Sequence, residues 1–327
     1  MNNLENIVIF DTSYGSYNQG DFIINKYATD ELKYLINDKF VYRVGTHNPV
    51  AHNYQILFRR NAFDFFENAK YKFLTGTNII NPNMRKIIPS WNVNLWNYLP
   101  YKNVILMGCG LAGNPDRVNG YTKKLLKKIL NTEYIHSTRD EKTKKFLQSI
   151  GCKAINTGCP TIWGIDEELC KNIPTQKSDS VIFTLTDYCK NLKFDQDLIN
   201  ILNNNYRDVY FWIQGSKDYE YLKGFDNIER IKLIYPSMDE YEKFLINNKA
   251  DYIGTRLHAG IFAIRNKKRS IIIAIDNRTR DMKESYNLNV IERNEIDEKL
   301  ENYIQGTIKT DIKVDFNAIN MWKSQFK

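Results

Sequence analysis

Residues that commonly hold metal ions are scarce in this sequence. It contains four histidines and five cysteines among 327 residues, and no two cysteines form a CxxC pair. Structural zinc sites need cysteines and histidines at short, regular spacing, so we expect none here. We also predict no catalytic metal, because no group of His, Cys and carboxylate residues has the spacing of a ligand set. The odd number and irregular spacing of the cysteines predict reduced thiols rather than a disulfide framework.

Long apolar runs are absent as well. No run approaches the ~20 residues that a membrane-spanning helix needs. The opening letters MNNLEN lack the basic start and apolar core of a signal peptide. We therefore expect a cytoplasmic protein. Internal repeats and low-complexity tracts are absent too, and 43% hydrophobic with 26% charged residues is typical of globular domains.

Basic and aromatic residues are abundant. The net charge is +8 at pH 7, which favours acidic partners such as nucleic acid, anionic lipid or phosphorylated substrates. The lysine pairs are scattered at helical spacing, which indicates solvated helix faces, so we expect no nucleic-acid partner. Peripheral, salt-sensitive contact with the inner face of an anionic membrane is compatible with this charge. The 21 Tyr, 17 Phe and 5 Trp suit large cores and stacking against sugar rings. The oligomeric state stays open.

Short apolar runs alternate with helical patterns in both halves of the chain. The runs that predict strands include residues 6–12, 40–44, 71–74, 104–107, 181–185, 209–213 and 231–234. This alternation predicts an α/β fold of two Rossmann-like, doubly wound domains facing across a cleft. The pattern breaks between Asp166 and Asp179, so we place the domain boundary there. The predicted parts are an N-terminal domain at 1–170, a C-terminal domain at 180–314, and a helix at 315–327 that packs back on the first domain.

The stretch from Ala250 to Asp276 carries the clearest candidate site. Its two apolar runs, at 252–254 and 270–275, read as parallel strands with one short helix between them. Arg256 and His258 lie at the first strand-to-helix junction. In open α/β sheets, ligands bind outside the carboxyl ends of strands, and helix N-termini there favour anions. The junction predicts a phosphate or carboxylate site. The alternative is that Arg256 is only a surface charge at a helix start and His258 an ordinary capping residue.

Polar loops follow other predicted strands. The loop SYGSYNQGD contains Asn18 and Gly20, and Asp21 is predicted as the N-cap of the next helix. This loop either cradles a ligand with its backbone N–H groups or only makes the turn. Thr77 and Asn78 belong to a second polar turn, after the strand at 71–74.

The letters GCGLAG at 108–113 match the dinucleotide motif GxGxxG. The triplet at 114–116, Asn-Pro-Asp, interrupts where the helix should begin, and the helical pattern starts only near Tyr121. We therefore interpret GCGLAG as a flexible loop rather than a dinucleotide site. Arg139 stands at another strand-to-helix junction, where an ion pair with Asp140 is the plain alternative.

Two further patterns imitate catalytic ones. Cys159 follows a predicted strand, but no His is nearby in sequence and buried cysteine is common. Asp195-Gln196-Asp197 imitates a metal-binding DxD, but it lies at a predicted helix start, where acidic residues are expected.

Three elements, in the same order, resemble those of the polysaccharide pyruvyl transferase family. The letters NQGD at 18–21 are similar to its N-terminal NxGD element, and Arg139-Asp140 to its central RD element. Residues 250–263 resemble its most diagnostic segment, built around Arg-Leu-His. The resemblance covers most of the chain and implies a GT-B-like architecture.

Characterised members of that family transfer the pyruvyl group of phosphoenolpyruvate onto two sugar hydroxyls, giving a cyclic ketal and phosphate. The resemblance implies the same activity on a cell-surface polysaccharide or its precursor, free or lipid-linked, without a cofactor. It implies that phosphoenolpyruvate is bound by Arg139, Arg256, Leu257 (through its backbone) and His258. His258 is then either the general acid or a cationic phosphate ligand.

The resemblance also divides the roles of the two domains. The C-terminal domain would hold phosphoenolpyruvate, and the N-terminal domain would face the acceptor. The candidate acceptor or loop residues are Asn18, Gly20, Asp21, Thr77 and Asn78.

The chain departs from the family pattern at three places. Ile275–Arg278 replaces a Tyr-Asp and a Lys, Thr75–Thr77 replaces a double-Gly turn, and Cys159-Pro160 replaces an acidic residue plus Pro. These differences mark a divergent branch and affect the expected acceptor more than the donor. The alternatives are a GT-B-type glycosyltransferase that uses a nucleotide sugar, and a non-catalytic glycan- or anion-binding relative.

Overall fold

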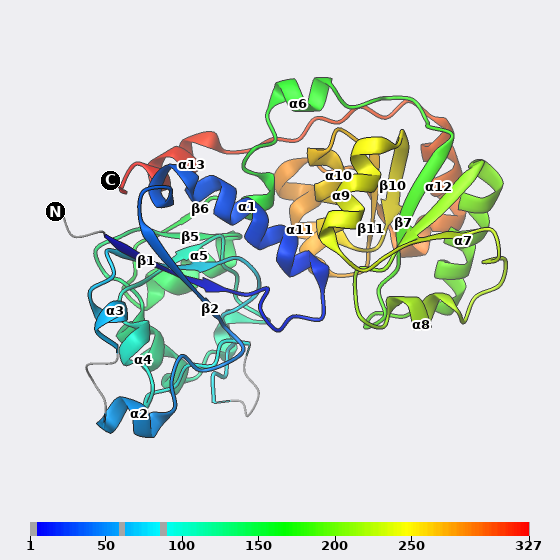
Figure 1. Ribbon diagram of the computed structural model, residues 1–327. Coiled ribbons are helices and arrows are strands. Elements are labelled where there is room, and N and C mark those ends of the chain that lie inside the picture. The colour runs from blue at the N-terminus through cyan, green and yellow to red at the C-terminus, as the bar shows by residue number, and fades with distance from the viewer. Residues whose placement is uncertain (1–4, 59–62, 86–89, 327) are drawn as a thin grey trace. The chain divides into compact units, whose positions relative to one another are not determined.

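The computed structural model describes residues 5–58, 63–85 and 90–326, which form two compact units (Figure 1). The first unit takes its residues from Met1–Ser16, Ile24–Trp163 and Asp315–Lys327. The second takes them from Tyr17–Ile23 and Gly164–Val314.

The first unit has a parallel sheet with the strand order β2-β1-β3-β4. Its strands are β1 (Asn6–Asp11), β2 (Phe40–Gly45), β3 (Tyr71–Thr75) and β4 (Val104–Met107). Two short parallel strands follow, β5 (His136–Thr138) and β6 (Ala154–Asn156). The order of the first four strands is that of flavodoxin-like sheets, in which ligands bind beyond the carboxyl ends of β1 and β3.

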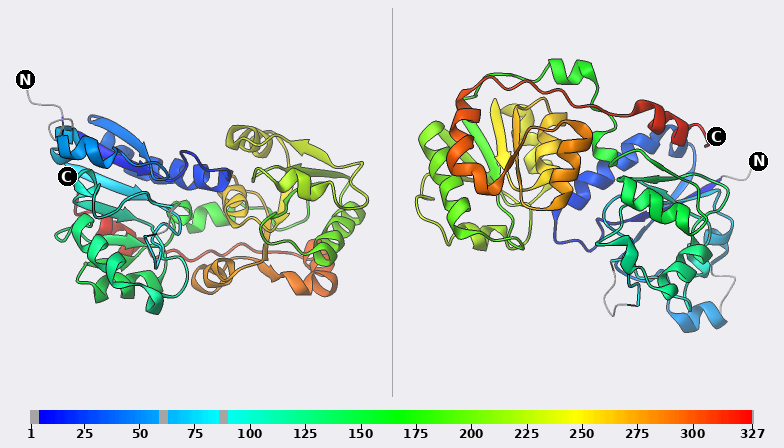
Figure 2. Two further views of the ribbon diagram at one scale, coloured as in Figure 1. Left: turned by 90° about the horizontal axis from the view of Figure 1, so that it is seen from below. Right: turned by 180° about the vertical axis from the view of Figure 1, so that it is seen from behind.

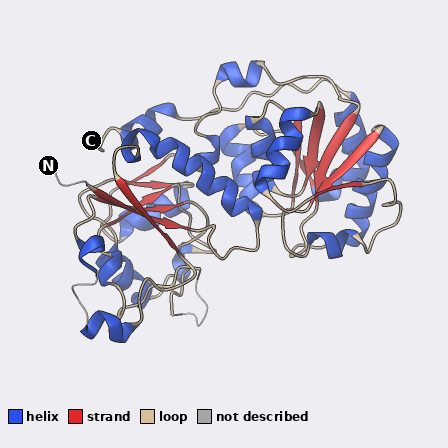
Figure 3. Ribbon diagram, in the orientation of Figure 1, coloured by secondary structure: helices blue, strands red, loops and turns tan. Residues whose placement is uncertain are grey.

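Helices cover the sheet of the first unit (Figure 3). They are α1 (Gln19–Ile36), α2 (Asn53–Phe58), α3 (Asp64–Glu67), α4 (Gly120–Ile129), α5 (Glu141–Ser149) and α13 (Phe316–Lys323), and α1 begins in the second unit. Short 3-10 turns lie at Leu99–Tyr101, Pro115–Arg117 and Pro160–Ile162.

Helices α4 and α13 show how the core of the first unit is built. Helix α4 begins where Asn119 caps the N–H of Thr122, and it buries Leu125, Leu126 and Ile129 against the sheet. Helix α13 buries Trp322 edge-on to Phe73 of β3, with ring centroids 6.0 Å apart. Fully burying such a ring contributes roughly 2–3 kcal/mol, so α13 is part of this core rather than an appendage.

The second unit has a six-stranded parallel sheet with the order β12-β11-β10-β7-β8-β9. Its strands are β7 (Ser180–Thr184), β8 (Asp208–Trp212), β9 (Lys232–Ile234), β10 (Ala250–Gly254), β11 (Ser270–Ala274) and β12 (Val290–Glu292). Numbered from β7, this is the Rossmann order 6-5-4-1-2-3, and the order reverses between β7 and β10. A ligand site is therefore expected beyond the carboxyl ends of these two strands.

Helices pack on both faces of this second sheet (Figure 2). They are α7 (Leu192–Asn205), α8 (Asp218–Leu222), α9 (Met238–Asn247), α10 (Leu257–Arg265), α11 (Asn277–Tyr286) and α12 (Ile296–Gln305), with a 3-10 turn at Arg293–Glu295. Helix α6 (Glu167–Lys171) lies in the segment that leads into β7. Apolar residues of α7 and α12 share one core cluster with those of β7, β10 and β11. On α9, Tyr241 stacks on Trp212 of β8, with centroids 4.0 Å apart.

Two sequence expectations about the first helix and the boundary need correction. Asp21 is not the N-cap of α1, because the helix begins at Gln19 and Asn18 Oδ1 accepts the N–H of Gly20 at 3.0 Å. The chain enters the second unit at Gly164, before the predicted boundary. Gly164 lies against the guanidinium of Arg265, which leaves no room for a Cβ atom.

No helix within the described ranges is both long enough and apolar enough to span a lipid bilayer.

Candidate functional site

Arg256 lies where the Rossmann order predicts a site, at the carboxyl end of β10. It is the residue before α10 and only 3% exposed. Its Nε donates to Asp218 Oδ2 at 3.2 Å and to the carbonyl of Leu185 at 3.1 Å. Its Nη2 donates to Asp187 Oδ1 at 3.0 Å and to Asp218 Oδ1. The guanidinium is therefore held by two carboxylates, one after β7 and the other after β8.

This pairing changes what Arg256 can offer a ligand. The Nε–Nη2 edge, which matches a carboxylate or phosphate in a bidentate pair, is already occupied by Asp218. Nη1 has no hydrogen-bond partner in the described ranges, so a ligand would approach that nitrogen. Burial raises the pKa of Asp218, against the attraction of Arg256. At Gly215, a Cβ would lie 3.2 Å from Arg256 Cζ, so this loop needs glycine to approach the guanidinium.

Leu257 and His258 form the first turn of α10, directly after Arg256. The first four N–H groups of a helix have no acceptor within the helix, and the helix dipole favours an anion beside them. Both side chains are half-buried. This turn therefore combines a backbone donor, an imidazole and the buried Arg256 at one strand end.

Tyr188 and Arg278 extend the site, and sequence reasoning missed both. Arg278 Nη2 donates to Tyr188 Oη at 3.0 Å, and Arg278 Nε donates to Asp276 Oδ2 at 2.7 Å. The Tyr188 ring centroid lies 5.0 Å from Arg256 Cζ, within range of a cation–π contact. The sequence contained a signal for Asp187 and Tyr188, because both follow closely after the predicted strand at 181–185, where ligand sites are expected.

The NQGD element at 18–21 joins the same unit as Arg256. Asn18 forms an isolated antiparallel bridge with Gly215, and its Oδ1 accepts Gln214 Nε2 at 2.8 Å. A Cβ at Gly20 would lie 2.9 Å from that same nitrogen. Asp21 donates its N–H to the carbonyl of Asn18 at 3.1 Å, inside the first turn of α1. Asn18 and Gly20 thus support the loop that packs against Arg256.

A second cluster lies at the strand ends of the first unit, where Asn78, Gly110 and Arg139 meet. A Cβ at Gly110 would collide with Asn78 Oδ1 and lie 2.6 Å from Arg139 Nε. Asn78 Oδ1 is buried without a hydrogen-bond partner in the described ranges. Arg139 is also 3.5 Å from Asp140 Oδ2, the ion pair considered above. The cluster therefore places a guanidinium and an amide against the backbone of Gly110, which has no side chain.

The GCGLAG loop positions this cluster, which corrects its interpretation as a flexible loop. Gly110 N donates to the carbonyl of Thr77 at 2.8 Å, and Ile80 N donates to the carbonyl of Gly110 at 3.1 Å. Thr77 adopts a left-handed backbone conformation, with φ of 55°. The loop is thus tied to the Thr77-Asn78 turn on both sides of Gly110. Gly108 and Gly110 permit close packing, and Gly113 adopts a left-handed backbone conformation, with φ of 82°.

The other two patterns are structural. Cys159 is 4% exposed, and burial raises the pKa of its thiol, so it does not resemble an activated nucleophile. Asp195 is fully buried and paired with Arg293 and the Tyr221 hydroxyl. In the described part of the chain, no group of three or more His, Cys, Asp or Glu residues could hold a metal ion.

Fold and site together define a class, namely GT-B-like proteins made of two Rossmann-like units with basic residues at the strand ends. Two solved structures of UDP-N-acetylglucosamine 2-epimerase share this fold. One is 12% identical with a TM-score of 0.51, covering 99% of this chain and 95% of its own. The other, a putative enzyme from Listeria monocytogenes, is 11% identical with a TM-score of 0.50, covering 99% and 97%.

Residues 18–277 match the polysaccharide pyruvyl transferase model, and the chain belongs to that family. No curated protein matches the sequence. The match begins at the NQGD element and runs past Arg256 and His258. The family makes the protein a pyruvyl transferase with a saccharide acceptor.

Proposed function

We propose that the protein transfers the pyruvyl group of phosphoenolpyruvate onto two hydroxyls of a saccharide, forming a cyclic ketal. The observation that carries this proposal is the Arg256-Leu257-His258 turn at the switch point of the second sheet, within the family match. Phosphoenolpyruvate has a carboxylate and a phosphate, and both favour helix N-termini and guanidinium groups. The acceptor is proposed to be a cell-surface polysaccharide or its precursor.

The proposed reaction needs one proton at the start. Protonation of the methylene carbon of phosphoenolpyruvate forms a C–H bond and leaves an oxocarbenium-like centre. One sugar hydroxyl adds to that centre, and its proton returns to the imidazole that gave up the first one. A second hydroxyl then displaces phosphate from the same carbon, and the proton of this hydroxyl leaves with the phosphate. In total, two C–O bonds to the sugar form, and the C–O bond that joined this carbon to the phosphate breaks. His258 is the proposed proton donor, since an imidazole exchanges protons near neutral pH.

Arg256 has a defined part in this scheme. Because Asp218 and Asp187 fix its guanidinium, its position is set before substrate arrives, and preorganised charge stabilises a developing negative charge most effectively. The amide of Leu257 and the Nη1 of Arg256 are the proposed phosphate donors. Arg278, held by Asp276 and Tyr188, is a further candidate for the carboxylate. Arg139 of the RD element is the proposed second cation for the donor.

The test is a product assay. Purified protein is incubated with phosphoenolpyruvate and a panel of saccharide acceptors, and products are measured by mass spectrometry together with phosphate release. We expect one pyruvyl increment per phosphate released. Phosphate release without a ketal product would contradict the transfer. Thermal stabilisation by nucleotide sugars but not by phosphoenolpyruvate would favour a glycosyltransferase instead.

A further inference from the structure

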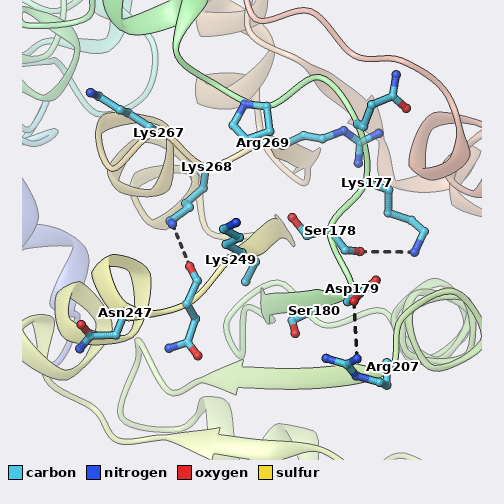
Figure 4. Close-up of a pocket in the computed structure, with 14 residues that line it drawn as sticks. Lys177, Ser178, Asp179, Ser180, Arg207, Asn247, Lys249, Lys267, Lys268 and Arg269 are labelled. Atoms are coloured by element: carbon cyan, nitrogen blue, oxygen red, sulfur yellow. Dashed lines mark hydrogen bonds and ion pairs between the residues drawn. The ribbon is translucent and has the colours of Figure 1, made fainter.

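A basic pocket lies in the second unit, at the opposite end of the strands from Arg256. Its volume is about 670 Å³. Figure 4 shows the residues that line it. It is lined by the segment before β7, the turn between α9 and β10, and the turn between α10 and β11. These are the amino ends of the strands, whereas Arg256 follows the carboxyl end of β10. The pocket is therefore separate from the proposed donor site within the same unit.

The charge of this pocket is strongly one-sided. Its lining has one acidic side chain, Asp179, and six basic ones, which are Lys177, Arg207, Lys249, Lys267, Lys268 and Arg269. The aspartate is itself shared with Arg207, 3.5 Å away. A concave surface with such an excess of positive charge concentrates anions more strongly than a flat one.

Both arginines of the pocket are paired with carboxylates, and of the two only Arg269 is buried. Arg269 is 1% exposed, pairs with Asp251 at 2.8 Å, and donates to three carbonyls at the end of α12. Arg207 pairs with Asp208 at 3.0 Å. These arginines are largely neutralised by carboxylates, so the unbalanced charge comes from the lysines.

None of the four lysines has a carboxylate partner in the described ranges. Lys177 Nζ donates to the carbonyl of Asn205 at 2.9 Å, and Lys268 Nζ donates to that of Asn248 at 2.8 Å. Lys249 and Lys267 are exposed, and their amino groups have no hydrogen-bond partner in that part of the chain. Lysines after a helix also offset the helix dipole. That effect explains Lys249 and Lys267 after α9 and α10, but not Lys177, which reaches the pocket from the segment before β7.

Lys267 occupies an unusual position for its type. It has φ of 58° and follows the C-cap of α10, where glycine is the common residue. A residue with a Cβ atom is disfavoured in this left-handed backbone conformation. That the chain places a lysine at this point is consistent with a use for its amino group.

We propose that this pocket binds a small soluble anion with two or more phosphate groups. A pocket of this volume suits a small molecule, and its lining has no aromatic side chain on which a nucleobase could stack. Four lysine amino groups without carboxylates match a diphosphate or triphosphate better than a single monoanion. The proposal does not depend on the pyruvyl transfer reaction, because its residues are not part of the donor site.

The test uses the full chain with inorganic pyrophosphate as probe and orthophosphate as comparison. Calorimetric titration is made on the wild type and on the double variant Lys249→Gln/Lys267→Gln. The matched control is Lys123→Gln/Lys124→Gln, which removes the same charge from exposed positions on α4. We expect pyrophosphate to bind more tightly than orthophosphate and the pocket variant to lose about tenfold or more in affinity, with less than about twofold for the control.

Hydrogen exchange locates the bound anion. We expect pyrophosphate to slow exchange at 174–180, 247–250 and 267–269. Equal losses in both double variants would reduce the effect to net charge and overturn the proposal. Slowed exchange only at 255–260 would place the anion at the donor site and also overturn it. So would binding to anionic vesicles in the absence of pyrophosphate binding, since the partner would then be a lipid surface.

Discussion

Arg256 is a buried cation whose partners are already in place. Asp218 is fully buried and depends on it, so removing the guanidinium would leave a buried carboxylate unpaired, at a cost of about 3–5 kcal/mol. Alanine at this position would therefore test folding as much as ligand binding. The informative change keeps the charge and removes the planar group.

We expect Arg256→Lys to weaken phosphoenolpyruvate binding by roughly 1–3 kcal/mol, because the lysine cannot keep the pairing with Asp218 and still present a directed donor. Calorimetric titration measures this, with Arg117→Lys, an exposed arginine on a 3-10 turn, as the matched control. Urea unfolding of both variants separates lost affinity from lost stability. Unchanged affinity in a folded Arg256→Lys protein would remove Arg256 from the donor site.

His258→Ala separates the two roles of the imidazole. If His258 donates the proton, turnover should fall by ~10²–10⁴ with little change in donor affinity. If it only binds phosphate, affinity and turnover should fall together. Steady-state kinetics and direct titration decide between them, with exposed His52→Ala as control. Wild-type values for both quantities would exclude either role.

His136 makes folding stability depend on pH. It is fully buried, its Nδ1 accepts the N–H of Leu106, and burial lowers its pKa from 6.5 to about 4. Below pH 6.5 the unfolded chain takes up a proton that the folded protein does not, so this stability is present above pH 6.5 and is lost as pH falls towards 4. We expect about 2 kcal/mol less stability at pH 5 than at pH 7 from this group.

Urea unfolding at the two pH values measures the effect. His136→Asn can keep the acceptor and removes the titrating group, so its difference between pH 5 and pH 7 should be smaller. An equal pH dependence in the variant would assign the effect to other groups.

At the scale of elements, the GCGLAG loop holds Asn78 and Arg139 against its backbone. Gly110→Ala should displace Arg139 Nε, which lies 2.6 Å from the new Cβ, and so imitate Arg139→Ala. We expect both variants to weaken phosphoenolpyruvate binding about tenfold or more, the value of one charge-assisted hydrogen bond. Titration checks this. Gly120→Ala is the control, because nothing lies within 4 Å of its Cβ. A Gly110→Ala protein with wild-type affinity would separate the loop from donor binding.

The elements also show how far the sequence could predict the site. Strand–helix alternation marks the junction before α10, and the position of Arg256 follows from it. Its partner Asp218 is 38 residues away in the chain and lies on another strand end, so the pairing depends on strand order, which local patterns do not contain. In the same way, the role of Gly110 depends on Arg139 and Asn78, which the fold brings to it from separate segments.

The boundary illustrates the same limit. Composition changes after Asp166, yet the second unit begins at Gly164 and also takes Tyr17–Ile23 from near the start of the chain. The Asn18–Gly215 bridge holds that early segment in place. Composition cannot reveal such a long-range contact.

For the whole molecule, we predict activity without a metal ion. Charge on the donor would be balanced by arginines and helix N-termini instead. Pyruvyl transfer should survive exhaustive EDTA treatment, measured as ketal product per unit time. Complete loss, restored by one divalent ion, would contradict this and would require ligands contributed by substrate.

The placement of α13 has a consequence for the order in which the protein matures during synthesis. The first unit draws its core from both ends of the sequence, with Trp322 against Phe73. On the ribosome, Phe73 is made long before Trp322, so the first unit cannot close this part of its core until α13 has been made. Until α13 has been made, part of the apolar face of β3 is exposed on the nascent chain. We expect chaperones to bind the nascent chain during that time.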